Sequence, residues 1–241
     1  MNHFSVVQNF VCNHEQRLEV IRRNTKKLGD VFDECEFFVN FNSDKNLEEV
    51  KDLYLSDIPN INFYNNLERD WALVTLALVK EVKTPYTIYL CEDIEVTSPK
   101  EDVLNFVNEM INDGGDLGFV GKIDKYTQQK FIEGLTPFNS IKSPGYKKLE
   151  HSYFYLGKHA PHKRIPVDSV FKTDWLIGAL EEFLVKGESC THDIPFRSKH
   201  LPNFYEGYYD FANGMRRFGD WKCYIPQKVI FKEYDDVKDK A

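Results

Sequence analysis

Short apolar runs alternate with helical patterns through the N-terminal part of the chain. In order, they occupy residues 4–12, 14–27, 35–41, 46–55, 61–64, 67–82 and 86–91. Apolar residues that recur every three to four positions indicate helices, whereas short β-branched and aromatic runs between turn residues indicate strands. Strands that alternate with helices form βαβ units, in which the strands lie parallel. The chain is therefore predicted to be an α/β protein with a mostly parallel central sheet flanked by helices.

The pattern becomes less regular in the second part of the chain. Further elements are predicted as helices at 100–111, 170–186 and 208–218 and as strands at 117–123 and 222–231. Residues 124–167 and 187–205 contain few periodic stretches, and segments of this length without a regular pattern are often functional. We predict a single domain, 1–241, with two halves at 1–123 and 124–232 and a charged tail at 233–241.

Composition excludes several classes of protein. The formal net charge of −7 argues against broad attraction to nucleic acid or to an anionic membrane. The five cysteines are scattered and form no C-x-x-C pair, which argues against a disulfide framework and favours a reducing compartment. The N-terminal residues do not resemble a signal peptide, and no stretch is apolar for long enough to span a bilayer. We expect a cytoplasmic protein with no nucleic-acid partner and no integral membrane segment.

Three carboxylates follow the apolar run at 86–91 directly. They are Glu92, Asp93 and Glu95. Like charges at the end of a buried strand repel one another, but a divalent cation makes the cluster favourable, and Mg²⁺ and Mn²⁺ prefer oxygen ligands. Open α/β sheets also bind their ligands at the carboxyl ends of the strands. The pattern predicts a ligand and metal site here; a solvated turn that uses acids for solubility is the alternative.

The strand–helix series ending in an acidic motif near Asp93 resembles nucleotide-sugar glycosyltransferases of the GT-A fold. In that family the acids hold a divalent cation on the donor diphosphate, where the metal neutralises the charge of the leaving group. The resemblance implies Mn²⁺ or Mg²⁺ on Asp93 and Glu95, with Glu92 and Asp93 close to the donor. The motif departs from the Asp-x-Asp pattern, because Cys91 stands where the family often has an acid.

The resemblance also implies that the nucleotide lies over the ends of the first two strands. Asn13, Asn40 and Asn42 occur at these ends, and their amides can read the edges of a base or ribose. Ordinary turn chemistry is the alternative for each of them. Asp70 resembles a polar position that often faces the nucleotide, although an acid at a helix start also interacts well with the helix dipole.

A second pair of carboxylates, Glu206 and Asp210, occurs late in the chain. The two are four residues apart near the start of the predicted 208–218 helix and so share one face. With Arg216 and Gly219 they resemble the late acidic motif of inverting GT-A enzymes, which supplies the general base for an acceptor hydroxyl. Both remain candidates for the base, with Glu206 preferred; acids that cap a helix start are the alternative.

The leading hypothesis is a metal-dependent glycosyltransferase that acts with inversion in polysaccharide or glycoconjugate biosynthesis. Its partners would be a nucleotide-sugar donor, bound by 1–123, and a saccharide or other hydroxyl acceptor, bound by 124–232. The sequence has no G-x-G-x-x-G after the first strand and no P-loop, which disfavours other nucleotide-binding folds. A non-catalytic glycosyltransferase-like domain that binds a sugar or a partner is the alternative, and a metal-dependent phosphotransfer enzyme is a third reading.

Overall fold

A computed structural model describes residues 3–12, 15–92, 94–120, 147–156, 168–186, 222–227 and 230–233. The helices in these ranges are α1 (Glu15–Val31), α2 (Leu47–Asp57), α3 (Trp71–Glu81), α4 (Lys100–Asn112) and α6 (Thr173–Lys186). The first strands along the chain are β1 (Phe4–Phe10), β2 (Phe37–Phe41), β3 (Ile61–Tyr64), β4 (Tyr86–Tyr89), β5 (Ile94–Val96) and β6 (Leu117–Phe119). The later strands are β7 (Lys147–Lys148), β8 (Ser152–Leu156), β9 (Ser169–Lys172), β10 (Lys222–Pro226) and β11 (Phe231–Glu233).

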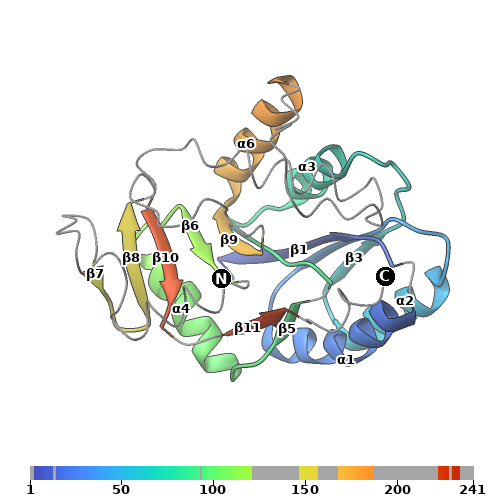
Figure 1. Ribbon diagram of the computed structural model, residues 1–241, viewed down its shortest axis with the longest axis horizontal. Helices are drawn as coiled ribbons and strands as arrows, with labels where there is room; N and C mark the ends of the chain where they lie inside the picture. Colours follow the sequence, from blue (N-terminus) through green and yellow to red (C-terminus); the bar gives the residue numbers. More distant parts are fainter. Residues whose placement is uncertain are drawn as a thin grey trace, which may run out of the picture.

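The described strands form a nine-stranded sheet in the order β3-β2-β1-β4-β9-β6-β10-β8-β7 and a two-stranded sheet of β11 and β5 (Figure 1). Strands β3, β2, β1 and β4 are parallel neighbours, as their alternation with helices predicts. Strand β9 lies antiparallel between β4 and β6, so the sheet is mixed beyond β4. The predicted α/β class is confirmed.

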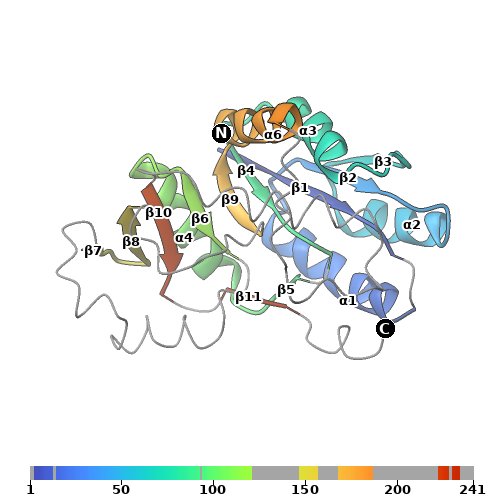
Figure 2. The same ribbon diagram turned by 45° about the horizontal axis from the view of Figure 1, so that its top comes forward.

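Helices cover both faces of the large sheet. Helices α3 and α6 pack together on one face, whereas α1, α2 and α4 lie on the other (Figures 1 and 2). Every residue of β1 and of β2 is buried, as expected for strands that are covered on both faces. The buried residues include the polar Ser5, Gln8, Asn9 and Asn40. None of the helices in the described ranges has the length and apolar character that crossing a membrane requires.

Several elements differ from the sequence prediction. Residues 170–172, predicted as the start of a helix, belong to β9, and the helix begins only at Thr173. Strands β7 and β8 occur within the segment that was predicted to be irregular. The predicted final strand at 222–231 is divided between β10 and β11, which belong to different sheets. In each case strand pairing with distant residues decided the structure, and local periodicity does not report such pairing.

Candidate functional site

The carboxyl ends of the parallel strands form one edge of the sheet, where open α/β folds bind ligands. Strand β1 leads there into Val11 and Cys12, β2 into Asn42, and β4 into Cys91 and Glu92. Strand β9 runs in the opposite direction and therefore begins at this edge. The edge thus collects residues from separate parts of the sequence.

Asn40 and Asn42 anchor the connection between β3 and α3 to this edge. The buried Asn40 amide donates to Asn9 Oδ1 (3.0 Å) and to the Asn66 carbonyl (3.2 Å), and it accepts from the Asn66 N–H (2.7 Å). Asn42 donates to the carbonyls of Asn66 (2.7 Å) and Glu68 (2.6 Å). These bonds give both residues a structural role, and their contacts with a nucleotide remain predictions.

Asp70 is the N-cap of α3. Its Oδ1 accepts hydrogen bonds from the N–H groups of Ala72 (2.9 Å) and Leu73 (3.1 Å), two donors that lack partners within the helix. Asp70 therefore lies at the helix start, where the alternative interpretation, a favourable interaction with the helix dipole, also applies. The nucleotide contact of Asp70 remains a prediction.

Glu92 is buried at the end of β4, with only 2% of its surface exposed. Its Oε1 forms an ion pair with Nη1 of Arg17 in the first turn of α1, and the same nitrogen donates to the Val11 carbonyl (3.3 Å). A buried carboxylate needs such a partner, because loss of hydration is otherwise too costly. The pair therefore links the ends of β1 and β4 to α1.

The rest of the acidic segment also lies along α1. Glu95 forms an ion pair with Lys27, and the Asn24 side chain donates to the Ile94 carbonyl between the two ion pairs. Figures 1 and 2 show β5 beside α1. Two of the three carboxylates predicted to bind ligand or metal are thus compensated by cations of the protein itself.

The remaining predicted site residues fall outside the described ranges. These are Asn13, Asp93, Glu206 and Asp210. Within the part of the chain that the structure describes, no group of three or more His, Cys, Asp or Glu side chains could hold a metal ion. Glu92 and Glu95 alone do not fit a metal centre, because Arg17 and Lys27 already neutralise them. A metal at this edge stays a prediction, in which Asp93 is the first candidate ligand.

The buried tyrosines beneath the edge are hydrogen-bond donors rather than bases. Burial raises the pKa of Tyr89 well above its ordinary value, and its hydroxyl donates to the Asn9 carbonyl (3.0 Å) while accepting from Trp71 Nε1 (2.8 Å). Burial, and to a smaller extent the charge of Glu92, also raises the pKa of Tyr54. Both phenols stay neutral near pH 7, so neither is a candidate for general base.

Sequence reasoning missed Asp168 and Arg17. Asp168 directly precedes β9, is 6% exposed, and accepts the Cys91 N–H through Oδ1 (2.6 Å). No periodicity or motif marks this position, which only the antiparallel pairing of β9 brings next to Cys91. Arg17 could have been found as a basic residue on the helix that follows the first strand, but its partner could not.

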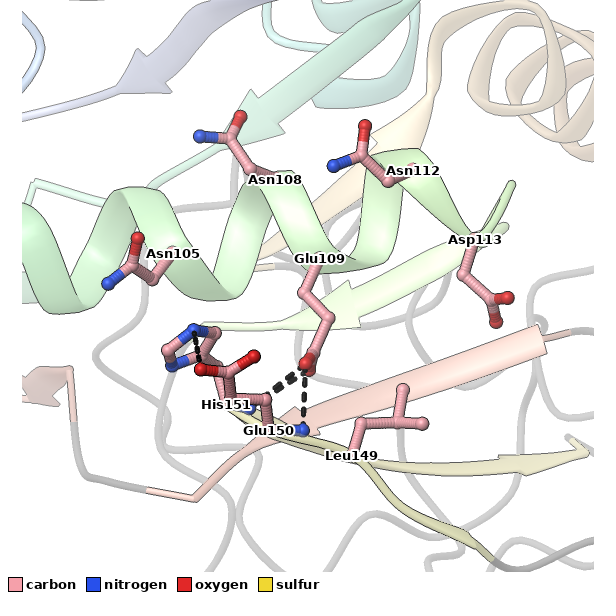
Figure 3. A pocket seen from close by; sticks show the side chains of 8 residues that line it. All are labelled: Asn105, Asn108, Glu109, Asn112, Asp113, Leu149, Glu150 and His151. Atoms are coloured by element: carbon pink, nitrogen blue, oxygen red, sulfur yellow. Dashed lines mark hydrogen bonds and ion pairs between the residues drawn. The ribbon is translucent and has the colours of Figure 1, made fainter.

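A polar cavity of about 520 Å³ lies elsewhere, between α4 and the connection from β7 to β8. Figure 3 shows Glu109 pointing toward the backbone of Glu150 and His151. Its Oε1 accepts hydrogen bonds from the N–H groups of Glu150 (2.9 Å) and His151 (3.0 Å). Asn108 and Asn112 point away from that connection, so the polar groups do not converge on one ligand (Figure 3). Strands β9, β6 and β10 lie between β4 and β8 in the sheet. At the usual spacing between neighbouring strands, β8 is therefore about 19 Å from β4. The cavity is therefore distinct from the carboxyl edge of β1 and β4.

The sequence matches no family model and no curated protein. Solved structures do match. The mannosyltransferase PcManGT from Pyrobaculum calidifontis, in complex with GDP-Man and Mn²⁺, is 11% identical with a TM-score of 0.56 over 96% of this chain and 56% of that chain. One structure of S. aureus TarS is 10% identical with a TM-score of 0.55 over 96% of this chain and 60% of that chain. Another, in complex with UDP-GlcNAc, is 10% identical with a TM-score of 0.50, covering 100% of this chain and 62% of that chain.

The strand order and these similarities define a GT-A-like, nucleotide-diphospho-sugar transferase fold. The resemblance inferred from the sequence is thereby confirmed at the level of the fold. The chain spans 60% of the length of the first TarS structure and 56% of the length of PcManGT. At identities this low, the similarity shows fold and leaves activity to the site itself.

Proposed function

We propose that this protein is a glycosyltransferase that moves a sugar from a nucleoside-diphosphate sugar to an acceptor hydroxyl. The observation that carries the proposal is the acidic end of β4, which lies at the carboxyl edge of a GT-A-like sheet and is fixed there by Arg17 and Asp168. Similar folds support it, since PcManGT was solved with GDP-Man and TarS with UDP or UDP-GlcNAc.

The donor would lie along the ends of β1, β2 and β4. Asn40 and Asn42 would shape this edge by holding the β3–α3 connection in place. The Arg17 guanidinium, partly exposed at 16%, lies beside the ends of β1 and β4, where it would donate to a donor diphosphate while Glu92 balances its charge. Asn13 and Asp70 belong to the proposed donor site on sequence grounds.

Metal dependence is the part of the proposal that rests on Asp93. A Mn²⁺ or Mg²⁺ ion bound there would neutralise charge on the departing diphosphate. Glu95 is paired with Lys27 through Oε1, and a metal that Glu95 shares with Asp93 would compete with this pair. The Mn²⁺ in the PcManGT complex supports a divalent cation for this fold.

For the acceptor, we propose Glu206 or Asp210 as the general base. A sugar hydroxyl is a weak nucleophile, so a carboxylate must accept its proton during attack, and direct displacement would invert the anomeric centre. The segments 124–167 and 187–205 would contribute to the acceptor site. The assignment of Glu206 and Asp210 rests on the late acidic motif in the sequence.

Binding of a donor panel tests the proposal. UDP, GDP, UDP-GlcNAc and GDP-mannose are added with and without Mn²⁺ while thermal unfolding is followed. A ligand at one hundred times its dissociation constant should stabilise the fold by about 2.7 kcal/mol. Transfer or donor hydrolysis should then fall in Glu206→Gln or Asp210→Asn, and Asp30→Asn, an exposed acid on α1, is the control. Absence of any shift across a full set of nucleoside diphosphates would refute the proposal.

A non-catalytic sugar- or partner-binding domain is the second candidate. It is favoured by Cys91 in the place of an acid and by the pairing of Glu92 and Glu95 with cations of α1. This candidate predicts donor binding without transfer or hydrolysis. A phosphotransfer enzyme would instead release product nucleotide without transferring the sugar, so product analysis separates all three.

A further inference from the structure

Asp168 joins two strand ends at the carboxyl edge. Ser169, the next residue, pairs with Tyr89 at the end of β4 and with Phe119 at the end of β6. Asp168 extends both pairings by one residue. Its carboxylate accepts a hydrogen bond from the Cys91 N–H (2.6 Å), and its backbone carbonyl accepts one from the Val120 N–H (3.2 Å). The side chain thus takes the place of a ladder carbonyl where β4 stops.

The hydrogen bond to Cys91 holds the backbone just after the end of β4. A carboxylate oxygen and an amide oxygen can both accept a backbone N–H, so this bond depends on where the acceptor oxygen lies. The bond is also buried, since Asp168 is 6% exposed, so water competes little for it. One residue further on, Arg17 holds the Glu92 side chain from the α1 side. The residue before β9 therefore holds the Cys91 backbone, whereas α1 holds the Glu92 side chain.

We propose that Asp168 is the positioning residue of the donor site: its carboxylate fixes the Cys91–Glu92 backbone in the conformation that binds the diphosphate of a nucleotide sugar. The inference rests on the proposed function. It follows from preorganisation, because a binding group held in place before the ligand arrives costs less ordering entropy on binding. Asp168 acts through the backbone of β4 and touches neither donor nor acceptor in this role.

Position and charge can be separated by substitution. Asp168→Asn retains an oxygen at the same place, whereas Asp168→Glu retains the charge but moves the oxygen by one methylene. A positioning role predicts that donor affinity falls less than about three-fold in Asp168→Asn and more than ten-fold in both Asp168→Glu and Asp168→Ala. Affinity is measured by titration calorimetry with whichever of UDP, GDP, UDP-GlcNAc and GDP-mannose the unsubstituted protein binds.

Asp116 provides a matched control for stability. It precedes β6 and accepts the Lys222 N–H (2.9 Å) through its carboxylate, but it lies at the opposite edge of the sheet. Asp116→Ala is expected to lower the urea midpoint and to leave donor affinity unchanged. A urea curve for each Asp168 variant shows that the protein is folded at the titration temperature.

Two results would overturn the inference. One is unchanged donor affinity in folded Asp168→Glu or Asp168→Ala. The other is retention of affinity in Asp168→Glu with loss in Asp168→Asn, which would make the charge rather than the position decisive. If Asp168→Ala does not fold, the Asn and Glu variants still decide between these outcomes. If the unsubstituted protein binds no nucleoside diphosphate, the proposed function itself has failed, and that result is recognised before any variant is made.

Discussion

Arg17 of α1 forms an ion pair with Glu92, whose side chain is 1% exposed at the end of β4. The carboxylate that looks like part of a cation site in the sequence therefore already has its cation, supplied by a helix rather than by a metal. This pair ties the acidic segment to α1, and the stability of the edge should depend on it.

We predict that Arg17→Leu destabilises the protein by about 3–5 kcal/mol, because it removes the cation that pairs with the buried Glu92 carboxylate. Denaturant unfolding measures the change. Replacing both partners, as in Arg17→Met with Glu92→Leu, should recover most of the loss, since the uncompensated charge is then gone.

The control for this prediction is Arg23→Leu on the same helix. Arg23 is exposed, and its Nε donates to the Glu19 carbonyl (3.3 Å) of the same helix, so a change within about 0.5 kcal/mol is expected. Equal effects of the two substitutions would show that the Arg17–Glu92 pair is not what stabilises this edge.

Gly29 marks the closest approach of α1 to α2. A Cβ at this position would lie 2.1 Å from the Asp57 carbonyl oxygen, a backbone atom that cannot rotate away. The neighbouring Thr25 hydroxyl donates to Asp57 Oδ2 (2.6 Å), which holds the two helices together at this point. Gly29→Ala is therefore expected to destabilise by about 1–3 kcal/mol through overpacking.

At Gly178 in α6, the same substitution to alanine is expected to raise stability rather than to lower it. Apart from its own helix backbone and its chain neighbours, a Cβ there would meet no heavy atom of the described residues within 4 Å, so Gly178→Ala gains helix propensity without a clash. We expect stabilisation of up to about 1 kcal/mol in the same denaturant assay. Destabilisation by Gly178→Ala as large as that by Gly29→Ala would contradict the packing argument.

Asn40 is predicted to contribute mainly to stability. Asn40→Leu should cost about 1–3 kcal/mol, because Asn9 Oδ1 and the Asn66 backbone would lose their partners in a buried region. Asn62→Leu on β3 is the matched control: its amide donates to exposed Glu36 (2.9 Å), and a change within about 0.5 kcal/mol is expected. Urea unfolding distinguishes the two, and equal losses would argue against the anchoring role.

The sequence predicted the parallel half of the fold because each of its elements carries a local signal. The runs that became β1 and β2 contain several Phe and Val residues, which favour strands, and both strands are buried throughout. Strand β9 carries no such signal. Its four residues run straight into α6 and are held as a strand by β4 and β6, which lie far away in the sequence.

The candidate site was predictable in position but only partly in detail. The acidic run after β4 indicated the correct edge of the sheet, since strand ends and charges are both visible in sequence. The partners of those charges were not, because Arg17 precedes Glu92 by 75 residues and Asp168 follows Cys91 by 77. Asn40 and Asp70 illustrate a further limit: the same residue types serve ligand binding and local hydrogen bonding.

Cys35 should be unreactive in the folded protein and should make stability depend on alkaline pH. Burial, reinforced by the charges of Asp33 and Glu34, raises the pKa of its thiol to about 12. The thiolate is the nucleophile, so native Cys35 should resist iodoacetamide up to about pH 10, whereas urea-unfolded protein should be labelled readily near pH 9. Peptide mass spectrometry measures the labelling of this residue.

The direction of the pH effect follows from proton binding. A thiol whose pKa is raised on folding stabilises the native state fully below the unfolded value, and this contribution is lost as the pH rises from about 9 toward 12. Cys35→Ala removes that component, so its stability should decline less steeply with pH across this window than that of the unsubstituted protein. Labelling of native Cys35 at pH 8.5 as fast as in urea, or identical pH slopes for the two proteins, would show that the thiol is not buried as described.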